Sequence, residues 1–411
     1  MNHLAPEEIY PCPLTWRQEH IADLWNALEA ELPAAFELRH RVHQDPRLSG
    51  SEQATAELVI QSMGLAGIPD VKGGRIFRIG SEKGPAIALR AELDALPIVE
   101  KSDVAWTSTN GAMHACGHDI HLAALSAVTR TIQGVGPILP LVGLLQPREE
   151  ASPSGALDLL AESTFQDSNI RAVFGAHVQP RIPYGTFSAV PGVVNSSADD
   201  FVIVFSAAGG HAGYPHATGD PIVAAAATVV ALQVVVARGI DPTHATVITV
   251  GAINGGTAPN VIPSSAQILG TVRASTESDR LLLHARLREA AESTASLYGC
   301  SADVQLIVGE PALINDESLT PVTAKWIRES ALLEESEPLR SCGADDFAYY
   351  GAACPSVMTF VGMGTGSGPS LHHESFVPPD DSVSLVAKVL LAGYLAGCEA
   401  VLGPLEGSYE S

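Results

Sequence analysis

Basic residues are scarce in this sequence of 411 residues. Lysine and arginine together number 23 against 46 aspartates and glutamates, which gives a net charge of -23. Proteins bind nucleic acids and anionic membranes through patches of lysine and arginine. We therefore expect no nucleic-acid partner, while the excess of acidic groups favours solubility and identifies no particular substrate.

Cysteine is also sparse. The six cysteines are scattered along the chain and form no C-x-x-C pair, so we expect mostly free thiols and a reducing compartment. Residues 1–31 contain no basic region followed by an apolar core, which predicts that no signal peptide is present. Together these features indicate a cytoplasmic protein.

Long hydrophobic runs are missing as well. The most apolar stretch, residues 222–237, is slightly short for a membrane span and includes Thr228 and Gln233. We predict that it forms a buried core helix and that the protein does not associate with membranes.

The length and composition of the chain predict two globular domains. Hydrophobic residues make up 46% and charged residues 17% of the sequence, which is typical of a globular protein. A chain of 411 residues is longer than a typical domain with a single hydrophobic core. Short apolar strands alternate with helical segments, which predicts an α/β fold with a partly parallel sheet flanked by helices. The expected elements are helices at residues 16–41 (kinked or divided at Pro33), 51–63, 120–131 and 155–161, and strands at 75–79, 85–89, 140–145 and 172–176.

A second domain is predicted as an insertion into the first. Its elements follow the order β-α-β-β-α-β of a split ferredoxin-like domain, at residues 201–206, 221–238, 246–253, 267–273, 278–298 and 303–308. A helix at 320–332, a strand at 356–361 and a helix at 383–396 follow. We therefore expect a main domain formed by residues 1–197 and 309–411, and an inserted domain at 198–308.

Polar residues follow several strands of the main domain. Asp94, the pair Glu149 and Glu150, and His177 each follow an apolar strand. In sheets of this kind, sites gather beyond the carboxyl ends of the strands. Residues 114–121 lie between two of these strand ends, so we expect one site to include them.

Residues 114–121 read HACGHDIH and concentrate possible metal ligands. Thiolate and imidazole groups bind zinc and its neighbours, and Gly117 lets the backbone turn so that Cys116 and His118 face one point. The alternative is a buried free cysteine beside surface histidines.

The acidic pair also has two interpretations. Neighbouring side chains in extended chain point in opposite directions. One of Glu149 and Glu150 can therefore bind a metal while the other takes a proton from a metal-activated water. The alternative is a solvated surface pair.

Five further residues are candidates with ordinary structural alternatives. His177 and His372 are possible ligands, or else a strand-end residue and a surface-loop residue. His211 and Asn260 suit a substrate carbonyl or carboxylate, but each, taken alone, is more typical of a turn. Arg273 can pair with a carboxylate through two hydrogen bonds, or form a surface salt bridge.

Taken together, these segments resemble the clan MH metallo-amidohydrolases, in the subfamily of aminoacylases, hippurate hydrolases and indole-acetyl-amino acid hydrolases. The resemblance covers roughly residues 36–380. It rests on motifs in the family's order, namely RAELDALP (90–97), MHACGHDIH (113–121), QPREE (146–150), FGAH (174–177), GGH (209–211), DP (220–221), NVIP (260–263), GTVR (270–273), GADDF (343–347) and LH (371–372).

This resemblance implies a zinc-peptidase-like catalytic domain with an inserted ferredoxin-like domain as lid and dimerisation surface. It implies one or two divalent ions, zinc or manganese first, with cobalt or nickel as alternatives. The implied ligands are Cys116, His118, Glu150, His177 and His372. Asp94 and Asp119 would orient these ligands.

The resemblance also implies roles in catalysis and substrate binding. Glu149 would be the general base. His211, reaching in from the partner subunit of a homodimer, would polarise the scissile carbonyl. Asn260 and Arg273 would hold the carboxylate of the substrate.

Three positions depart from the family pattern. Arg148 stands where the family usually has alanine, and an inward-pointing guanidinium there would lower the pKa of Glu149. Glu92 replaces a usual aspartate. Asp345 replaces a usual glutamate, and its shorter side chain puts a role at a second metal in question.

The sequence therefore predicts a metal-dependent amidohydrolase that cleaves N-acyl amino acids into a carboxylic acid and an amino acid. One alternative is a dipeptidase or carboxypeptidase that uses the same site. Others are a non-catalytic ligand-binding protein and a purely structural zinc site. The motifs do not specify the acyl group, the amino acid or the metal.

Overall fold

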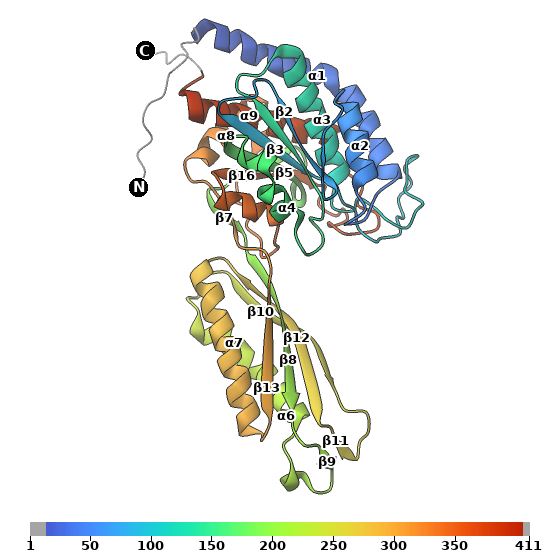
Figure 1. Ribbon diagram of the computed structural model, residues 1–411, viewed down its shortest axis with the longest axis vertical. Helices are drawn as coiled ribbons and strands as arrows, with labels where there is room; N and C mark the ends of the chain where they lie inside the picture. Colours follow the sequence, from blue (N-terminus) through green and yellow to red (C-terminus); the bar gives the residue numbers. More distant parts are fainter. Residues whose placement is uncertain (1–13, 406–411) are drawn as a thin grey trace. The chain divides into compact units, whose positions relative to one another are not determined.

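A computed structural model describes residues 14–405, with side chains from residue 18 onward. Within these residues the chain forms two compact units (Figure 1). The first unit contains residues up to 191, 315–339 and those from 350. The second contains residues 192–314 and 340–349. The second unit thus contains more residues than the inserted domain expected at 198–308. One link to residues 340–349 is the hydrogen bond that the Ser341 amide donates to the Val194 carbonyl at 2.9 Å.

The first unit is built on a mixed sheet with the strand order β1-β2-β4-β3-β5-β16-β6-β15. Strand β3 runs parallel to β4 and β5, and β5 runs parallel to β16. Strand β2 pairs antiparallel with β4, and β6 pairs antiparallel with β16. The expected mixed, partly parallel sheet is confirmed. Its strands are β1 (Asp70–Val71), β2 (Gly74–Ile79), β3 (Ala86–Glu92), β4 (Leu141–Gln146), β5 (Ile170–Pro183), β6 (Thr186–Ser188), β15 (Leu333–Glu334) and β16 (Ser356–Gly364).

Helices flank this sheet and close its core (Figure 1). Leu24, Leu28 and Leu32 line one face of α1 at helical spacing and are buried, and α3 is buried over most of its length. The helices are α1 (Leu14–Gln44), α2 (Gln53–Ser62), α3 (His118–Val135), α4 (Gly155–Ala161), α5 (Ser163–Gln166), α8 (Leu319–Glu329) and α9 (Asp381–Leu402), with a 3₁₀ helix at Asp346–Ala352.

The second unit has the predicted β-α-β-β-α-β order. Its antiparallel sheet has the order β10-β12-β8-β13, and α6 and α7 lie on one face (Figure 1). Phe201, Ile203 and Phe205 alternate along β8 into the core between sheet and helices. The elements are β7 (Gly192–Asn195), β8 (Ser197–Ser206), β9 (Gly210–His211), a 3₁₀ helix (Pro215–Ala217), α6 (Pro221–Gly239), β10 (Thr246–Gly255), β11 (Val261–Ile262), β12 (Ser265–Ala274), α7 (Glu277–Leu297), β13 (Ser301–Val308) and β14 (Leu313–Asn315).

Two local predictions need correction. Helix α1 continues through Pro33 and is not divided there, because its buried leucine face holds the helix on the core across the missing hydrogen bond. Strand β5 does not end at His177 but continues to Pro183, since it keeps pairing with β16 beyond that point. His177 therefore lies inside a strand, level with the carboxyl end of β3, whose Arg90 pairs with Gly175.

Helix α6 is not the fully buried helix that its composition predicted. Ala224, Ala225 and Leu232 are buried, but Val230 and Val234 are 67% and 55% exposed. By length and composition, α6 and α9 are the two helices in residues 14–405 that could cross a membrane. The signal is weak because core helices pass the same test, and 67% of the most apolar part of α9 is buried.

Candidate metal centre

The candidate site lies where β3, β4 and the start of α3 meet. Asp94 follows β3, Glu149 follows β4, and His118 is the first residue of α3. Gly117 precedes the helix with a positive φ of 87°, and a Cβ there would lie 2.4 Å from Cγ2 of Val178. Only glycine fits this turn, which brings Cys116 and His118 to the same point as predicted.

All five predicted ligand residues come together in the first unit. The Cys116 Sγ lies 3.5 Å from Nε2 of His177 and 3.4 Å from Nε2 of His372. His372 Nε2 also lies 3.2 Å from a carboxylate oxygen of Glu150. Two triads result, whose ligand atoms lie within 4.8 Å of one another: Cys116, His118, His177 and Cys116, Glu150, His372. Because both include Cys116, these residues would hold one or two divalent ions.

Hydrogen bonds set the histidines for metal binding. His118 donates from Nδ1 to the Asp94 carbonyl at 2.9 Å, and its buried Nε2 has no hydrogen-bond partner. His177 donates from Nδ1 to the Val178 carbonyl at 2.7 Å, so its Nε2 carries the lone pair. Such second contacts are typical of metal-bound imidazoles. The residues present therefore fit a divalent cation.

His372 reaches the cluster through an unusual backbone conformation. Its φ is 63°, in the left-handed region that a non-glycine residue rarely adopts. The His372 amide donates to the Ala115 carbonyl at 2.9 Å, which holds this conformation. Such conformations cost about 1–3 kcal/mol and gather at functional sites. The next histidine, His373, instead accepts a local hydrogen bond from the Ser375 amide at 3.1 Å.

The cluster concentrates negative charge. Burial alone would lower the pKa of His118, but the hydrogen bond and charge of Asp94 and the charge of Glu92 raise it to about 10. Burial, with the charges of Glu150 and Glu149, raises the pKa of the Cys116 thiol well above its usual range. A divalent cation would offset this charge, and binding would release protons from both ligands.

Glu149 stands beside the ligand set. One of its carboxylate oxygens lies 3.7 Å from Nε2 of His118, and its side chain is 10% exposed. It forms a group with His118 and Glu150 whose ligand atoms also lie within 4.8 Å of one another. A carboxylate in this place is close enough to exchange a proton with a molecule bound at the cluster.

The two predicted orienting aspartates have different surroundings. The Asp94 side chain accepts hydrogen bonds from the Glu150 amide at 2.9 Å and from Ser49 at 2.7 Å. It therefore touches the loop that carries a predicted ligand. Asp119 bonds instead to Arg39 at 3.1 Å and His43 at 3.0 Å. It follows His118 directly in the chain and so shares the backbone of α3 with that predicted ligand.

The Arg148 guanidinium does not point toward the acidic pair. It pairs with Asp158 and donates to the carbonyls of Lys72 at 2.9 Å and Pro153 at 3.2 Å. The Arg148 amide donates to Glu52 at 2.9 Å. These contacts fix the turn before Glu149. The guanidinium of Arg148 therefore does not have the inward orientation on which the predicted effect on Glu149 depended.

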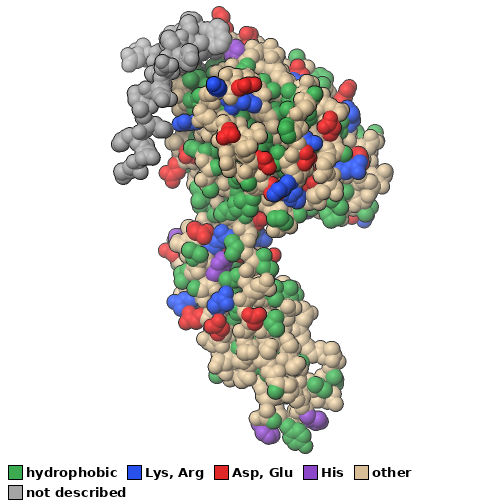
Figure 2. Space-filling view, viewed as in Figure 1, with side chains coloured by type: hydrophobic (Ala, Val, Ile, Leu, Met, Phe, Trp, Pro, Cys, Tyr) green, Lys and Arg blue, Asp and Glu red, His purple; other side chains and the backbone are tan. Residues whose placement is uncertain are grey.

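The predicted substrate-binding residues belong to the second unit. His211 in β9 pairs with Val261 in β11, and the Asn260 carbonyl accepts a hydrogen bond from the Ala212 amide at 3.1 Å. His211 and Asn260 thus share one exposed ribbon. Figure 2 shows histidine and apolar side chains together at this end of the unit. Arg273 lies near the other end of β12, paired with Ala198 in β8.

The tautomer of His211 suits a hydrogen-bond donor. Its Nδ1 accepts a hydrogen bond from the Gly213 amide at 2.9 Å. The neutral ring therefore carries its proton on Nε2. The side chain is exposed, so this proton can be offered to a bound molecule.

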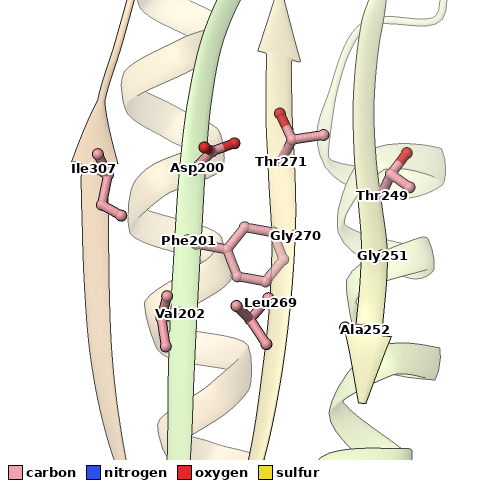
Figure 3. A pocket seen from close by; sticks show the side chains of 10 residues that line it. All are labelled: Asp200, Phe201, Val202, Thr249, Gly251, Ala252, Leu269, Gly270, Thr271 and Ile307. Atoms are coloured by element: carbon pink, nitrogen blue, oxygen red, sulfur yellow. The ribbon is translucent and has the colours of Figure 1, made fainter. Parts of the chain in front are cut away.

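A hollow of about 340 Å³ lies on the open face of the second unit's sheet (Figure 3). Val202, Leu269 and Ile307 give it an apolar lining, and Asp200 and Thr271 lie at one end. It is separate from the predicted metal ligands in sequence and belongs to the second unit alone.

Residue patterns alone did not reveal the buried contacts behind the cluster. His43 donates from Nδ1 to Asp119 at 3.0 Å and from Nε2 to Glu100 at 3.1 Å. Glu92, noted only as a departure, pairs with Arg90 and His121. The presence of a charged residue such as Glu92 in an otherwise apolar strand was the feature of the sequence that could have indicated these buried contacts. Asp345 accepts a hydrogen bond from the Phe347 amide at 2.8 Å and belongs to the second unit.

Known proteins resemble this chain over most of its length. Peptidase family M20/M25/M40 matches residues 88–393. The chain is 34% identical over 378 residues to N-acetyl-L-cysteine deacetylase of Bacillus subtilis (strain 168), covering 90% of this chain and 89% of that protein. It is 35% identical over 354 residues to IAA-amino acid hydrolase ILR1-like 2 of Arabidopsis thaliana, covering 81% and 79%.

A solved structure matches the fold as well. The Bacillus subtilis YXEP protein, described as a dinuclear metal binding peptidase from the M20 family, superposes with a TM-score of 0.76 at 28% identity. The match covers 91% of this chain and 99% of that one. The chain therefore belongs to peptidase family M20/M25/M40 and is a metal-dependent hydrolase of amide bonds.

Proposed function

We propose that the enzyme cleaves N-acyl amino acids into a carboxylic acid and a free amino acid, with Glu149 as the general base. The observation that carries this proposal is the position of Glu149, 3.7 Å from His118 and beside a five-residue ligand set. The names of two relatives, an N-acetyl-L-cysteine deacetylase and an IAA-amino acid hydrolase, support this substrate class.

The proposed mechanism assigns the ligand role to Cys116, His118, Glu150, His177 and His372. When bound, divalent ions would supply Lewis acidity that lowers the pKa of water towards ~7 and polarises the substrate carbonyl. Glu149 takes the proton of the attacking water and then donates it to the leaving amine. A purely structural zinc site is disfavoured, because such sites have four closed ligands and no additional carboxylate.

Residues of the second unit would bind the substrate. We propose that Nε2 of His211 donates to the developing oxyanion, and that Asn260 and Arg273 hold the substrate carboxylate. His211 and Asn260 share one ribbon, whereas Arg273 lies toward the other end of β12, which supports the idea that one site uses His211 and Asn260 from a second copy. The exposed valines of α6 are a surface that a homodimer could bury.

We further propose that the enzyme works in the cytoplasm. The five cysteines within residues 14–405 are free. A reducing compartment keeps thiols in this state.

A substrate panel tests the activity. N-acetyl, benzoyl and long-chain acyl amino acids would be compared with dipeptides, each with Zn²⁺, Mn²⁺, Co²⁺ and Ni²⁺. We expect the highest kcat/KM on one acyl class. Preference for dipeptides would favour the peptidase alternative, which the description of the YXEP protein keeps relevant. No turnover by metal-loaded protein would favour a ligand-binding protein.

A further inference from the structure

Two buried residues that the proposed mechanism does not use, Glu92 and His121, connect to the metal centre. Glu92 lies at the end of β3 and is 1% exposed, and His121 lies one turn into α3 and is fully buried. The His121 ring lies 4.8 Å from the His177 ring, centroid to centroid, in an edge-on arrangement.

The hydrogen bonds of His121 determine its tautomer. Its Nε2 lies 3.1 Å from the Val178 amide, which can only donate. The Nε2 atom must therefore be the acceptor, so Nδ1 carries the proton and donates it to Glu92 at 2.8 Å. Arg90 pairs with the same carboxylate and keeps Glu92 in place.

The Val178 peptide links His121 to a proposed ligand. Its amide donates to His121, and the Val178 carbonyl accepts the Nδ1 proton of His177 at 2.7 Å. The Nε2 of His177 then lies 3.5 Å from Sγ of Cys116. A continuous chain of contacts thus runs from Glu92 through His121 and Val178 to His177.

We propose that Glu92 and His121 are positioning residues that fix His177 for metal binding. Glu92 and His121 form a group with His118 whose nitrogen and oxygen atoms lie within 4.8 Å of one another, but both nitrogens of His121 are already hydrogen-bonded, to Val178 and to Glu92. Their effect passes through the backbone of Val178, which also packs against Gly117. The glutamate at position 92 is therefore a functional part of the site and not a neutral departure from the family pattern.

The experiment compares two replacements of His121. Glutamine places a polar atom where Nε2 was, so it can still accept from Val178, whereas asparagine places one where Nδ1 was and can reach only Glu92. The metal-free protein would be titrated with Zn²⁺ against a chromophoric chelator. Outer partners of metal-bound histidines are worth ~10- to 100-fold in affinity. We expect the affinity for one Zn²⁺ ion to fall by this factor in His121→Asn, and by no more than a few-fold in His121→Gln.

Cobalt gives a second readout that does not depend on activity. The visible spectrum of the Co²⁺ protein should change in His121→Asn and stay close to wild type in His121→Gln. Thr131→Val is the matched control, because Thr131 is buried in the same helix and its hydroxyl donates to the Ala127 carbonyl of that helix at 2.9 Å. It should lower stability without changing metal affinity.

Equal losses in the asparagine and glutamine variants would overturn the inference, and so would an equal loss in Thr131→Val. The inference rests on the proposed metal centre. If the wild-type protein itself binds no metal, the proposed function fails first. If it binds metal and His121→Asn binds equally well, only the positioning role fails.

Discussion

The metal cluster and the ribbon formed by β9 and β11 are built in opposite ways. Cys116, His118 and His177 are between 1% and 7% exposed, and buried hydrogen bonds fix the rings of His118 and His177. His211 and Asn260 are exposed, and their hydrogen bonds are to nearby residues of the second unit such as Ala212, Gly213 and Tyr214. Buried contacts thus hold the proposed ligands in place, whereas the proposed substrate-binding residues of the ribbon lie open to solvent. The following predictions test this contrast.

The largest effect is expected from Cys116→Ser, because Cys116 belongs to both triads. A serine hydroxyl is a much poorer ligand than a thiolate for these metals. Metal affinity should fall by more than the ~100-fold that loss of an outer partner costs. Elemental analysis would measure the ion content per chain. Cys398→Ser, another buried free cysteine, is the control and should keep its metal; unchanged stoichiometry in Cys116→Ser would exclude Cys116 as a main ligand.

Glu149→Gln should lose ~10²- to 10⁴-fold in kcat, which is the usual contribution of general acid–base catalysis. The amide keeps the shape of the side chain but cannot take a proton. Metal content and thermal stability serve as internal controls and should match the wild type. Near-normal activity in a metal-loaded variant would remove Glu149 from the mechanism.

His211→Asn should lose ~10²- to 10³-fold in kcat, as expected for one donor to an oxyanion. Its stability should not change because the side chain is exposed. His216→Asn is the matched control, since His216 is an exposed histidine close by in the chain.

Mixing the two inactive variants tests whether His211 serves a second copy. If it does, His211→Asn mixed with Glu149→Gln should regain up to about a quarter of wild-type activity, because half of random dimers are mixed and each holds one complete site. No recovery after verified subunit exchange would mean that His211 acts within its own chain.

The same contrast explains which features could be predicted from the sequence. Strand and helix positions follow from local periodicity, and motifs such as HACGHDIH and QPREE identified residues that the fold brings together. The contacts behind the cluster could not be predicted in this way. Glu92 and His121 are 29 residues apart, and their pairing depends on how β3 lies against α3. The end of β5 was missed for a similar reason, since pairing with β16 and not local composition extends it.

Gly117→Ala should destabilise the fold by several kcal/mol. A side chain at positive φ costs about 1–2 kcal/mol, and the clash with Val178 adds about 1–3 kcal/mol. Gly50 has nearly the same φ of 86° but nothing within 4 Å of a Cβ. Gly50→Ala should therefore show the backbone cost alone in urea denaturation. Equal losses in the two variants would mean that the turn at Gly117 is not tightly packed.

The smallest predicted effect concerns the pH dependence of stability and tests the buried side of the contrast. Burial alone would lower the pKa of His43, but the charges and hydrogen bonds of Asp119 and Glu100 raise it from 6.5 to about 9. Because the pKa is higher in the folded state, the stabilisation is fully present below pH 6.5 and is lost as the pH rises through 9. The free energy of unfolding should fall by up to about 3 kcal/mol over this range.

His43→Gln separates this contribution from those of other titrating groups. Glutamine can keep one hydrogen bond but carries no charge, so the variant should lose less stability than the wild type between pH 6.5 and 9. Urea denaturation at both pH values gives the difference directly. Parallel losses in the two proteins would show that His43 is not held as a cation between Asp119 and Glu100. Ion pairing of His43 with Asp119 and Glu100 would then contribute little to the stability of the region around α3. The rigidity of the cluster would depend mainly on the packing of Gly117 against Val178.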